Sequence, residues 1–362
     1  IGPEAPLVEG VADAVRSAGI ACFGPDASAA RMEGSKKFAK QVMARAGVPT
    51  AAWRSFTEQE PCEEYVRRLD GPCVVKADGL AAGKGVIVAT DVDEALAGVR
   101  ECFSGRFGDA GATVIVEETL DGPECSLLAL TDGTTLVPLA TAQDHKRALD
   151  GDKGPNTGGM GVYSPVPMVT PEEHAAMVAI EQRVVDELRA EGITYSGCLY
   201  GGFMLTKDGP KVLEFNARFG DPETQVVLPL LEGDLLHIME ACTNGTLADE
   251  EVRFSDGAAA CVILASGGYP VAYEKGKPIS GLVDGQLPDE ENVTVYHSGT
   301  ALTEDGQLVT NGGRVLGVTA TGPRLTNALS HAYEAAEKIH FDKLHKRSDI
   351  GLRALKALAE KQ

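Results

Sequence analysis

Glu214, Asn216 and Arg218 alternate along one apolar run of this sequence, and their types and spacing suit phosphate chemistry. Residues two apart on a β-strand point to the same face, so the carboxylate, the amide oxygen and the guanidinium would lie side by side. Hard oxygen ligands suit Mg²⁺ held jointly with nucleotide phosphates, and a neighbouring arginine suits an anionic intermediate. The alternative is that the three form the solvated face of an edge strand.

A glycine-rich segment, 74–86, places lysines and glycines between two apolar runs. Glycine lets backbone N–H groups approach phosphate oxygens, and Lys76 and Lys84 would supply the countercharge. The segment is not a P-loop, because Gly85 and β-branched residues follow Lys84 where Ser or Thr and a helix are required. Taken alone, it could equally be an ordinary hairpin.

Two further stretches could serve a site. One apolar run ends in Glu117 and Glu118, and the chain turns apolar again after Glu124, a pattern that also fits a solvated strand edge. The Gly/Pro/Asn-rich stretch 142–168 is longer than most loops in compact domains, and such loops are usually functional or disordered. We therefore expect a long functional loop there.

Regular elements must position these residues. From apolar periodicity, capping residues and turn signals, the expected helices lie at 5–18, 35–46, 59–69, 91–103, 171–191, 222–231, 234–242 and 323–341. The expected strands lie at 21–24, 73–78, 85–90, 113–120, 124–131, 134–140, 195–206, 211–218, 258–265, 293–300 and 308–320. The apolar stripe of the last helix should pack inward on a sheet.

Charge and composition exclude several functions. A net charge of −20 argues against nucleic acid as a partner, because nucleic-acid binders usually show clustered Lys and Arg, and it favours a small-molecule substrate. The apolar runs fall far short of the roughly 20 residues that cross a bilayer, so no membrane partner is expected. The eight cysteines lack zinc-site spacing, which favours core residues of a reduced, cytoplasmic protein.

Taken in order, Lys36, Lys76, the pair Glu117-Glu118 and the pattern of Glu214 and Asn216 resemble the ATP-grasp superfamily. Longer motifs are similar, nearly letter for letter, to the glycinamide ribonucleotide synthetase family within it. These motifs are Gly2–Leu7, Lys76–Gly85, Asp144–Arg147, Gly154–Gly161 and Arg218–Thr224. The resemblance runs from Ile1 to about Arg353.

The resemblance implies a multidomain protein of α/β and α+β class. Residues 1–33 would be the remnant of a Rossmann-like N-terminal domain with its linker, 34–255 an ATP-grasp domain, and 256–362 a C-terminal α+β domain. Residues 58–120 would form the small nucleotide lid. About the first 60 residues of the family's pattern, including a glycine-rich turn after its first strand, would precede Ile1.

The family's reaction is the ATP-dependent ligation of glycine to 5-phosphoribosylamine in purine biosynthesis. ATP would phosphorylate glycine to glycyl phosphate, and the amine would then displace phosphate. The implied cofactors are ATP and Mg²⁺ or Mn²⁺, and the expected state is a monomer or weak homodimer. Because glycyl phosphate and phosphoribosylamine are labile, the long loop would exclude water from the site.

The resemblance also implies roles for single residues. The expected ATP-binding residues are Lys36, Lys76 and Lys84 at the phosphates, Glu117, Glu118 and Leu120 at adenine, and Glu124 at the ribose. Glu214 and Asn216 match metal ligands, and Arg218 would stabilise charge on the acyl phosphate. The expected substrate-binding residues are Glu4, Asp144, Lys146, Pro155, Asn156, Thr157, Gly158 and Asp221. Lys146 could instead be an ordinary surface lysine.

One departure and two alternatives stay open. Many ATP-grasp ligases carry a further acidic metal ligand on the preceding strand, and Tyr200–Phe203 offers none, so a second metal site is left undefined. A carboxyphosphate-forming carboxylase would not be expected to carry the motifs at 144–147 and 154–158. A nucleotide-binding protein without turnover would not be expected to keep Lys76 and the 214–218 pattern.

Overall fold

The computed structural model describes residues 4–80, 85–288 and 290–360, which form two compact units. Unit 1 comprises Ile1–Pro138, Pro171–Phe219 and Asp234–Glu251. Unit 2 comprises Leu139–Thr170, Gly220–Gly233 and Val252–Gln362. The chain thus passes between the units several times, whereas the expected division at 33/34 and 255/256 is linear along the sequence. That division stays a prediction.

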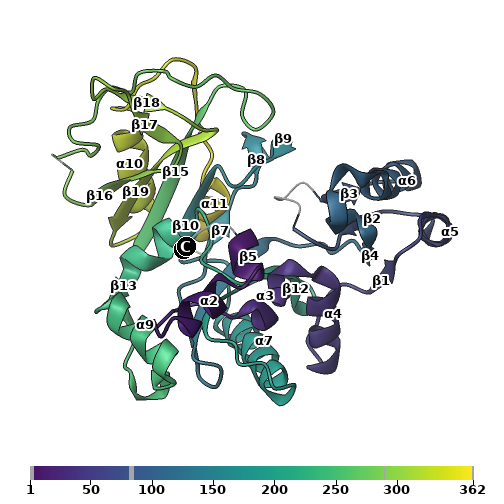
Figure 1. Ribbon diagram of the computed structural model, residues 1–362. Helices are drawn as coiled ribbons and strands as arrows, with labels where there is room; N and C mark the ends of the chain where they lie inside the picture. Colours follow the sequence, from purple (N-terminus) through teal and green to yellow (C-terminus); the bar gives the residue numbers. More distant parts are fainter. Residues whose placement is uncertain (1–3, 81–84, 289, 361–362) are drawn as a thin grey trace. The chain divides into compact units, whose positions relative to one another are not determined.

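The larger sheet of unit 1 has four antiparallel strands in the order β12–β11–β5–β6 (Figure 1). These strands are β5 (Glu124–Thr131), β6 (Leu136–Pro138), β11 (Gly197–Thr206) and β12 (Gly209–Asn216). Helix α7 (Pro171–Ala190) contacts all four strands. It buries Met177, Ile180, Val184 and Leu188, whose spacing of three to four residues forms one helical face.

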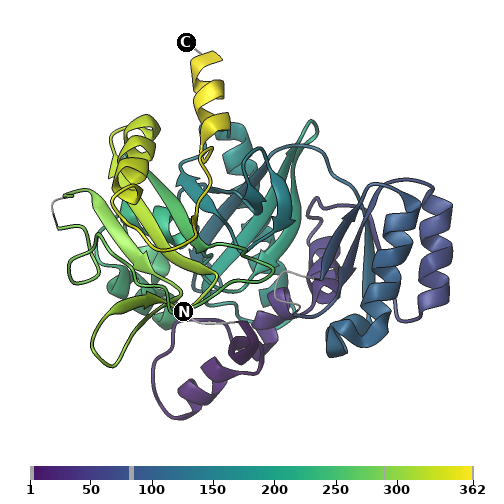
Figure 2. The same cartoon turned by 90° about the horizontal axis from the view of Figure 1, so that it is seen from above.

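A smaller sheet in unit 1, with the order β1–β4–β2–β3, includes most of the segment 58–120 and is called the lid below, although its role as a nucleotide lid stays a prediction. Its elements are β1 (Trp53–Phe56), β2 (Cys73–Ala77), β3 (Val86–Ala89), β4 (Val114–Glu118), α5 (Gln59–Leu69) and α6 (Val92–Glu101). Both helices cover the same face of the sheet (Figure 2). The core between them includes the fully buried thiols of Cys62, Cys73 and Cys102, as expected for cysteines that act as small apolar residues.

The first part of unit 1 departs from the expectation of a helix at 5–18 and a strand at 21–24. The helix is interrupted at Gly10, whose φ of 91° lies in the left-handed region, and forms α1 (Glu4–Val8) and α2 (Val11–Ser17). The predicted strand is wrong. The carbonyls of Cys22 and Gly24 accept hydrogen bonds from the Arg16 guanidinium instead of a neighbouring strand.

Two consecutive helices, α3 (Ala27–Gly34) and α4 (Lys36–Arg45), lead into the lid. Ser35 is the N-cap of α4, as predicted, and its hydroxyl accepts a hydrogen bond from the Phe38 N–H at 3.1 Å. After the larger sheet, α9 (Leu235–Asn244) completes the regular helices described for unit 1. None of the helices in the described part of the chain is both long and apolar enough to cross a membrane.

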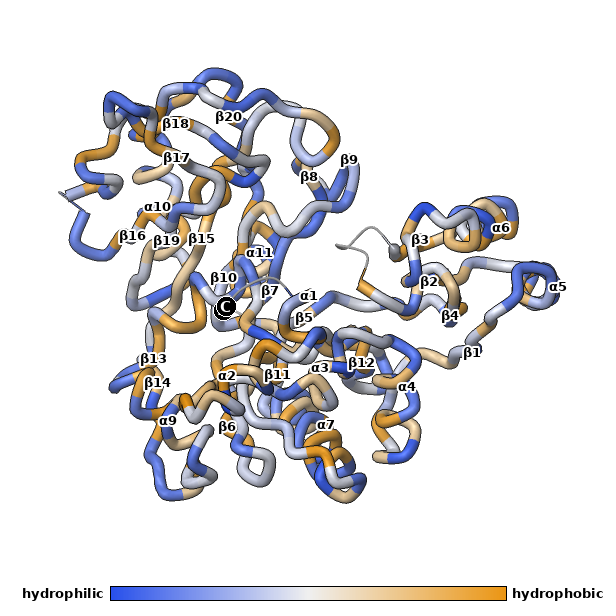
Figure 3. The backbone as a smooth tube through the Cα atoms, viewed as in Figure 1, coloured by the Kyte–Doolittle hydropathy of each residue, from blue (hydrophilic) through white to orange (hydrophobic). Residues whose placement is uncertain are grey.

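Unit 2 is built on a sheet with the order β16–β19–β15–β10–β7. The strands are β7 (Gln143–Asp144), β10 (Gly161–Ser164), β15 (Ala258–Ser266), β16 (Val293–His297), β19 (Arg314–Gly322) and β20 (Leu344–His345), which pairs with β15. All nine residues of β15 are buried, and Figure 3 shows this strand as strongly hydrophobic. Helix α10 (Leu325–Ala336) packs on β15 and β19 through Leu325, Ala328 and Leu329, so the inward packing is confirmed.

The remaining elements of unit 2 are short. They are β8 (Arg147–Leu149), β9 (Lys153–Asn156), β13 (Leu231–Glu232), β14 (Arg253–Phe254), β17 (Thr300–Leu302), β18 (Leu308–Thr310), α8 (Thr224–Val227) and α11 (Leu352–Glu360). The expectation of one loop over 142–168 is therefore only partly correct. This stretch supplies β10 to the buried sheet, because the short apolar run 161–164 finds a strand partner remote in the sequence, β15. It also forms a local hairpin, β8–β9.

Candidate active site

A pocket in unit 1 gathers residues from α1, α3, α4, the lid strands and β12. Its charged and amide side chains are Glu4, Glu33, Lys36, Lys40, Lys76, Glu117, Glu214, Asn216 and Arg218. Its apolar lining comes from Met32, Ala39, Met43, Leu80, Val86, Leu213 and Phe215. The combination offers one surface for a planar apolar group and another for phosphates and a cation.

The pocket brings together seven of the predicted site residues: Glu4, Lys36, Lys76, Glu117, Glu214, Asn216 and Arg218. Glu118, Leu120 and Glu124 are not among its lining residues. Glu118 ties β4 to the chain before β1, because its carboxylate accepts the Ala52 N–H at 3.0 Å and its own N–H donates to the Ala52 carbonyl at 2.9 Å. Lys84 lies outside the described residues. The adenine and ribose roles stay predictions.

The end of β12 carries the polar pattern that opened the analysis of the sequence. Glu214 and Asn216 lie on the strand, and Arg218 lies two residues beyond its last residue. An Arg218 Nη2 atom lies 2.9 Å from Oε1 of Glu33, and Oε2 of Glu33 accepts the Ala217 N–H at 2.8 Å. Burial raises the pKa of Glu33, although the positive charge of Arg218 opposes this shift.

Three buried charges form a second group beside the glycine-rich segment. The Glu117 carboxylate lies between two ammonium groups, 3.1 Å from Lys40 Nζ and 3.0 Å from Lys76 Nζ. Lys40 also donates to the Thr50 hydroxyl at 2.7 Å. Burial lowers the pKa of Lys40 to about 8, although Glu117 counteracts this. Two cations thus share one carboxylate, which leaves the group with net positive charge.

The N-terminus of α4 holds the start of the glycine-rich segment. The Asp78 carboxylate accepts the Lys37 N–H at 2.6 Å and the Ser35 hydroxyl at 3.1 Å. Lys36 Nζ donates to the Gly79 carbonyl at 3.1 Å, and burial lowers the pKa of Lys36. The α4 lysine and the segment bearing Lys76 are therefore fixed to each other.

The sequence analysis missed Glu33 and Lys40. Lys40 follows Lys36 by one helical turn, so the two lie on the same face of α4. Glu33 comes two residues before the N-cap of that helix, and at 9% exposure it is a buried carboxylate. Both were detectable as charged residues that interrupt otherwise apolar helix faces.

The residues at the end of β12 suit a divalent cation that is completed by ligand oxygens. Glu214 and Asn216 offer two hard oxygen donors in the pocket, and no cluster of three or more Asp, Glu, His or Cys suited to a metal is found among the described residues. Across the strand pair, Gly202 faces Glu214 and Tyr200 faces Asn216. The preceding strand therefore adds no acidic ligand opposite these positions.

The other predicted substrate residues lie in unit 2. Asp144 ends β7, and burial, followed by the negative charge of Glu223, raises the pKa of its carboxyl well above the usual range. The N–H and hydroxyl of Thr157 donate to the Lys146 carbonyl at 2.7 and 2.9 Å. Residues 144–158 therefore form one hydrogen-bonded arrangement.

Arg314, at the start of β19, joins two of these predicted segments and was missed. Its guanidinium donates to the Gly158 carbonyl at 2.6 Å and to the Asp221 carboxylate at 2.6 Å. The Gly158 N–H donates to the Tyr269 hydroxyl at 3.1 Å. Pro155 and Asn156 lie at the exposed end of β9. Unit 2 thus brings 155–158 and Asp221 together, while their substrate roles stay predictions.

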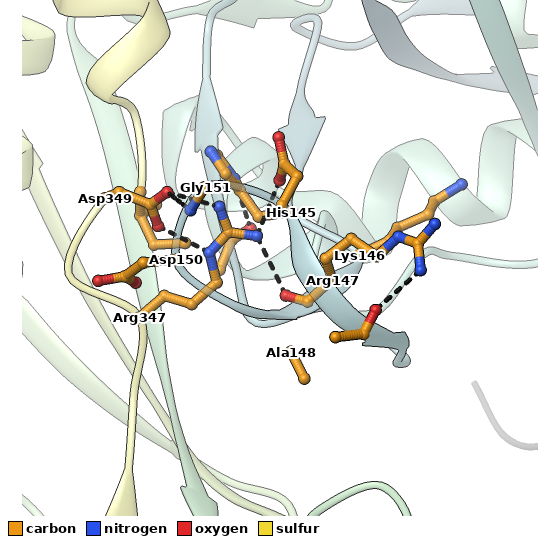
Figure 4. Close-up of polar contacts among 12 residues, drawn as sticks. His145, Lys146, Arg147, Ala148, Asp150, Gly151, Arg347 and Asp349 are labelled. Carbon is orange, nitrogen blue, oxygen red and sulfur yellow. Dashed lines mark hydrogen bonds and ion pairs between the residues drawn. The ribbon is translucent and has the colours of Figure 1, made fainter.

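A second cluster in unit 2 surrounds Arg347, which is 1% exposed (Figure 4). Its guanidinium donates to both oxygens of Asp349 at 2.7 and 2.8 Å, to Asp152 at 2.9 Å and to the Arg147 carbonyl at 3.0 Å. The neighbouring His145 accepts the Gly351 N–H at 3.3 Å, and burial lowers its pKa to about 4. The cluster holds the first residue of β8, Arg147, and the turn between β8 and β9.

Comparison with known families gives matches along most of the chain. The models of the N domain, the ATP-grasp (A) domain and the C domain of phosphoribosylglycinamide synthetase match residues 1–33, 34–224 and 259–353. The phosphoribosylamine–glycine ligase of Rhizobium meliloti is 50% identical over 357 residues, 98% of this chain and 83% of that protein. The trifunctional purine biosynthetic protein adenosine-3 of Gallus gallus is 49% identical over 364 residues, 99% of this chain and 36% of that protein.

Solved structures give a consistent result. The phosphoribosylamine–glycine ligase of Thermotoga maritima aligns with a TM-score of 0.83 and 38% identity, covering 91% of this chain and 81% of that one. The biotin carboxylase domain of the Hydrogenobacter thermophilus 2-oxoglutarate carboxylase aligns with a TM-score of 0.72 and 17% identity, covering 92% and 72%. The second likeness concerns the ATP-grasp fold alone.

Proposed function

Because this chain belongs to the phosphoribosylglycinamide synthetase family, we propose that the pocket of unit 1 is where it uses ATP to activate glycine. The protein is an ATP-dependent ligase of purine biosynthesis, and it forms a C–N bond between glycine and 5-phosphoribosylamine. One observation supports this location above others. The pocket unites two buried lysines with Glu214, Asn216 and Arg218.

In the first step, a glycine carboxylate oxygen attacks the γ-phosphorus of ATP, and ADP leaves with the electrons of the broken P–O bond. Lys36 and Lys76 supply positive charge where the phosphates would lie, and Arg218 faces the acyl phosphate that forms. Phosphoryl transfer needs positioning and charge stabilisation more than covalent help from the protein. The pocket has both, since its cations are held by neighbouring carboxylates and carbonyls.

Glu214 and Asn216 are the side chains that would hold a divalent cation, Mg²⁺ or Mn²⁺, jointly with ATP. When bound, such a cation neutralises phosphate charge during transfer. Lys40 pairs with Oε1 of Glu117, and Lys76 pairs with Oε2. Because Glu117 keeps the ion pair with Lys40, Lys76 can exchange its contact with Glu117 for one with a phosphate at lower electrostatic cost.

In the second step, the amine of phosphoribosylamine attacks the carbonyl carbon of glycyl phosphate, the C–O bond to phosphate breaks, and the amine loses a proton. We assign the binding of phosphoribosylamine and glycine to Glu4, Asp144, Lys146, residues 155–158 and Asp221. Support comes from the contacts that hold 155–158 to Lys146 and, through Arg314, to Asp221. Asp144 and Asp221 offer carboxylates there, and Lys146 and Arg314 offer positive charge, which suits a phosphorylated sugar.

We further propose a monomer or weak homodimer as the working form. The eight cysteines are free, and seven are buried, which favours a reducing compartment such as the cytoplasm. Sedimentation velocity over a hundredfold concentration range tests the first point, and fractionation tests the second.

The test of function is ADP release in four mixtures: ATP alone, with glycine, with glycine and hydroxylamine, and with glycine and phosphoribosylamine. We expect hydroxamate in the third and glycinamide ribonucleotide in the fourth, with Glu214→Gln as the inactive control. A fifth mixture replaces glycine with bicarbonate, and turnover that follows bicarbonate instead of glycine would assign a carboxylase. Nucleotide binding without any turnover would assign a binding protein.

A further inference from the structure

Glu33 sits at the end of α3 with a different partner on each of its carboxylate oxygens. Oε1 lies 2.9 Å from Nη2 of Arg218, and Oε2 accepts the N–H of Ala217 at 2.8 Å. One side chain thus holds both the main chain and the side chain of consecutive residues just beyond β12. We propose that Glu33 is a positioning residue that fixes the Arg218 guanidinium for stabilisation of the acyl phosphate. The proposal rests on the function assigned to Arg218 above.

Arg218 lies beyond the ladder of β12, which ends two residues earlier at Asn216. Its hydrogen bonds to Asn216 Oδ1 and to the Phe219 carbonyl are both 3.4 Å long, so the ion pair with Glu33 is clearly shorter. An arginine side chain loses rotamer freedom when it is fixed. An ion pair formed before substrate arrives supplies part of that ordering in advance.

Burial makes the arrangement asymmetric. The side chain of Glu33 is 7% exposed and that of Arg218 is 28% exposed, so the carboxylate lies behind the guanidinium, and the guanidinium keeps an accessible side. A guanidinium has five N–H donors in a planar fork, and one directed to Glu33 leaves the fork able to donate to an oxyanion as well. Glu33 therefore orients the guanidinium and leaves other N–H groups of it able to donate to a ligand.

A role for Glu33 as metal ligand or general base is less compatible with these contacts, although the residue lines the pocket. Both of its oxygens are engaged by groups of the protein, Arg218 and Ala217. A ligand or base would have to break one of these contacts. A positioning residue keeps both throughout the reaction.

The experiment is a double-mutant cycle on the full chain with Glu33→Gln and Arg218→Lys. Gln keeps the size of the side chain and an acceptor for Ala217 but removes the charge, and Lys keeps the charge of Arg218 but removes the fork. We expect Glu33→Gln alone to lower kcat by about 10- to 100-fold in both hydroxamate and amide formation, with KM for ATP changed by less than about threefold. In the Arg218→Lys background, the same substitution should cost less than about threefold.

Glu63→Gln is the matched control. Glu63 is equally buried, at 8% exposure, and is paired with Arg67 and Arg100, but it lies in the lid and outside the pocket lining. Its substitution should leave kcat within about twofold and should not interact with Arg218→Lys. A general loss of stability from removing a buried carboxylate would affect both variants alike.

Equal losses from Glu33→Gln in both backgrounds would overturn the positioning role while leaving the assigned function intact. Unchanged kcat in Arg218→Lys alone would overturn the role of Arg218, and the proposal for Glu33 with it. Should Glu33→Gln fail to fold, Glu33→Asp, which keeps the charge on a shorter side chain, goes through the same cycle with the same non-additivity expected.

Discussion

In the described part of the chain, buried lysine and arginine side chains lie in two regions, the pocket of unit 1 and the Arg347 cluster of unit 2, and their charges are satisfied differently. Four hydrogen bonds from the Arg347 guanidinium end on groups of the protein. In the pocket, Lys36 contacts a carbonyl, and Lys40 and Lys76 share a single carboxylate. Buried cations with full protein partners maintain structure, whereas under-compensated cations that line a pocket favour an anionic ligand.

The largest effect should come from Glu214 and Asn216, the two residues proposed to hold the metal. We expect Glu214→Gln or Asn216→Ala to reduce ligation by about a thousandfold or more, because each removes an oxygen donor rather than a core side chain. ADP release at saturating Mg²⁺ measures this, and an unchanged melting temperature shows that the fold is retained. Near-normal turnover would remove the basis for a metal site at the end of β12.

The next effect should be on stability. Arg347→Met removes a buried charge, leaves Asp349 without its ion-pair partner and leaves Asp152 with the exposed Arg353 alone, so the free energy of unfolding should fall by about 3 kcal/mol. Urea titration followed by circular dichroism measures the change. A loss below about 1 kcal/mol would show that the cluster is not the structural counterpart of the pocket.

His145 adds a pH dependence to the same cluster. Its pKa falls from 6.5 to about 4 on folding, chiefly through burial, so between these values the unfolded chain binds a proton that the folded chain does not. The contribution of neutral His145 to the free energy of unfolding is complete above pH 6.5. It is lost as the pH falls toward 4, by about 3 kcal/mol in total. Urea midpoints across this range should fall less steeply for His145→Gln than for the native chain.

The smallest effect should come from Arg353, which pairs with Asp152 at the edge of the Arg347 cluster but is 61% exposed. Exposed ion pairs contribute little, so Arg353→Met should change the free energy of unfolding by no more than about 0.5 kcal/mol. A loss as large as that of Arg347→Met would mean that burial is not what separates the two arginines.

Local sequence signals were sufficient for much of the fold. The helix expected at 59–69 occurs at Gln59–Leu69, because its apolar residues recur at helical spacing and Asp70 ends it in the left-handed conformation. The strand with Glu214 and Asn216 was also recognisable, because the Asp208-Gly209 turn marks where it begins. Capping at Ser35 needed only the four residues around it.

What local signals could not supply were contacts between distant residues. Glu33 meets Ala217 at a separation of 184 positions, and Arg347 meets the carbonyl of Arg147 at a separation of 200. The segment 21–24 failed as a strand for a different reason: the carbonyls of Cys22 and Gly24 accept hydrogen bonds from the nearby Arg16 instead of from a neighbouring strand. A local sequence pattern indicates which secondary structure a segment prefers, and the contacts it finds in the fold decide which structure forms.

The reactivity of the Cys62, Cys73 and Cys102 thiols can report how often the core of the lid is exposed to solvent. All three are fully buried, and burial raises the pKa of each, to about 12 for Cys62 and about 11 for Cys102. Alkylation requires an accessible thiolate, so their labelling rate in the native protein follows how often the lid core opens. Mass spectrometry of the labelled peptides, with and without nucleotide, would therefore measure the opening rate of the lid core without any introduced probe.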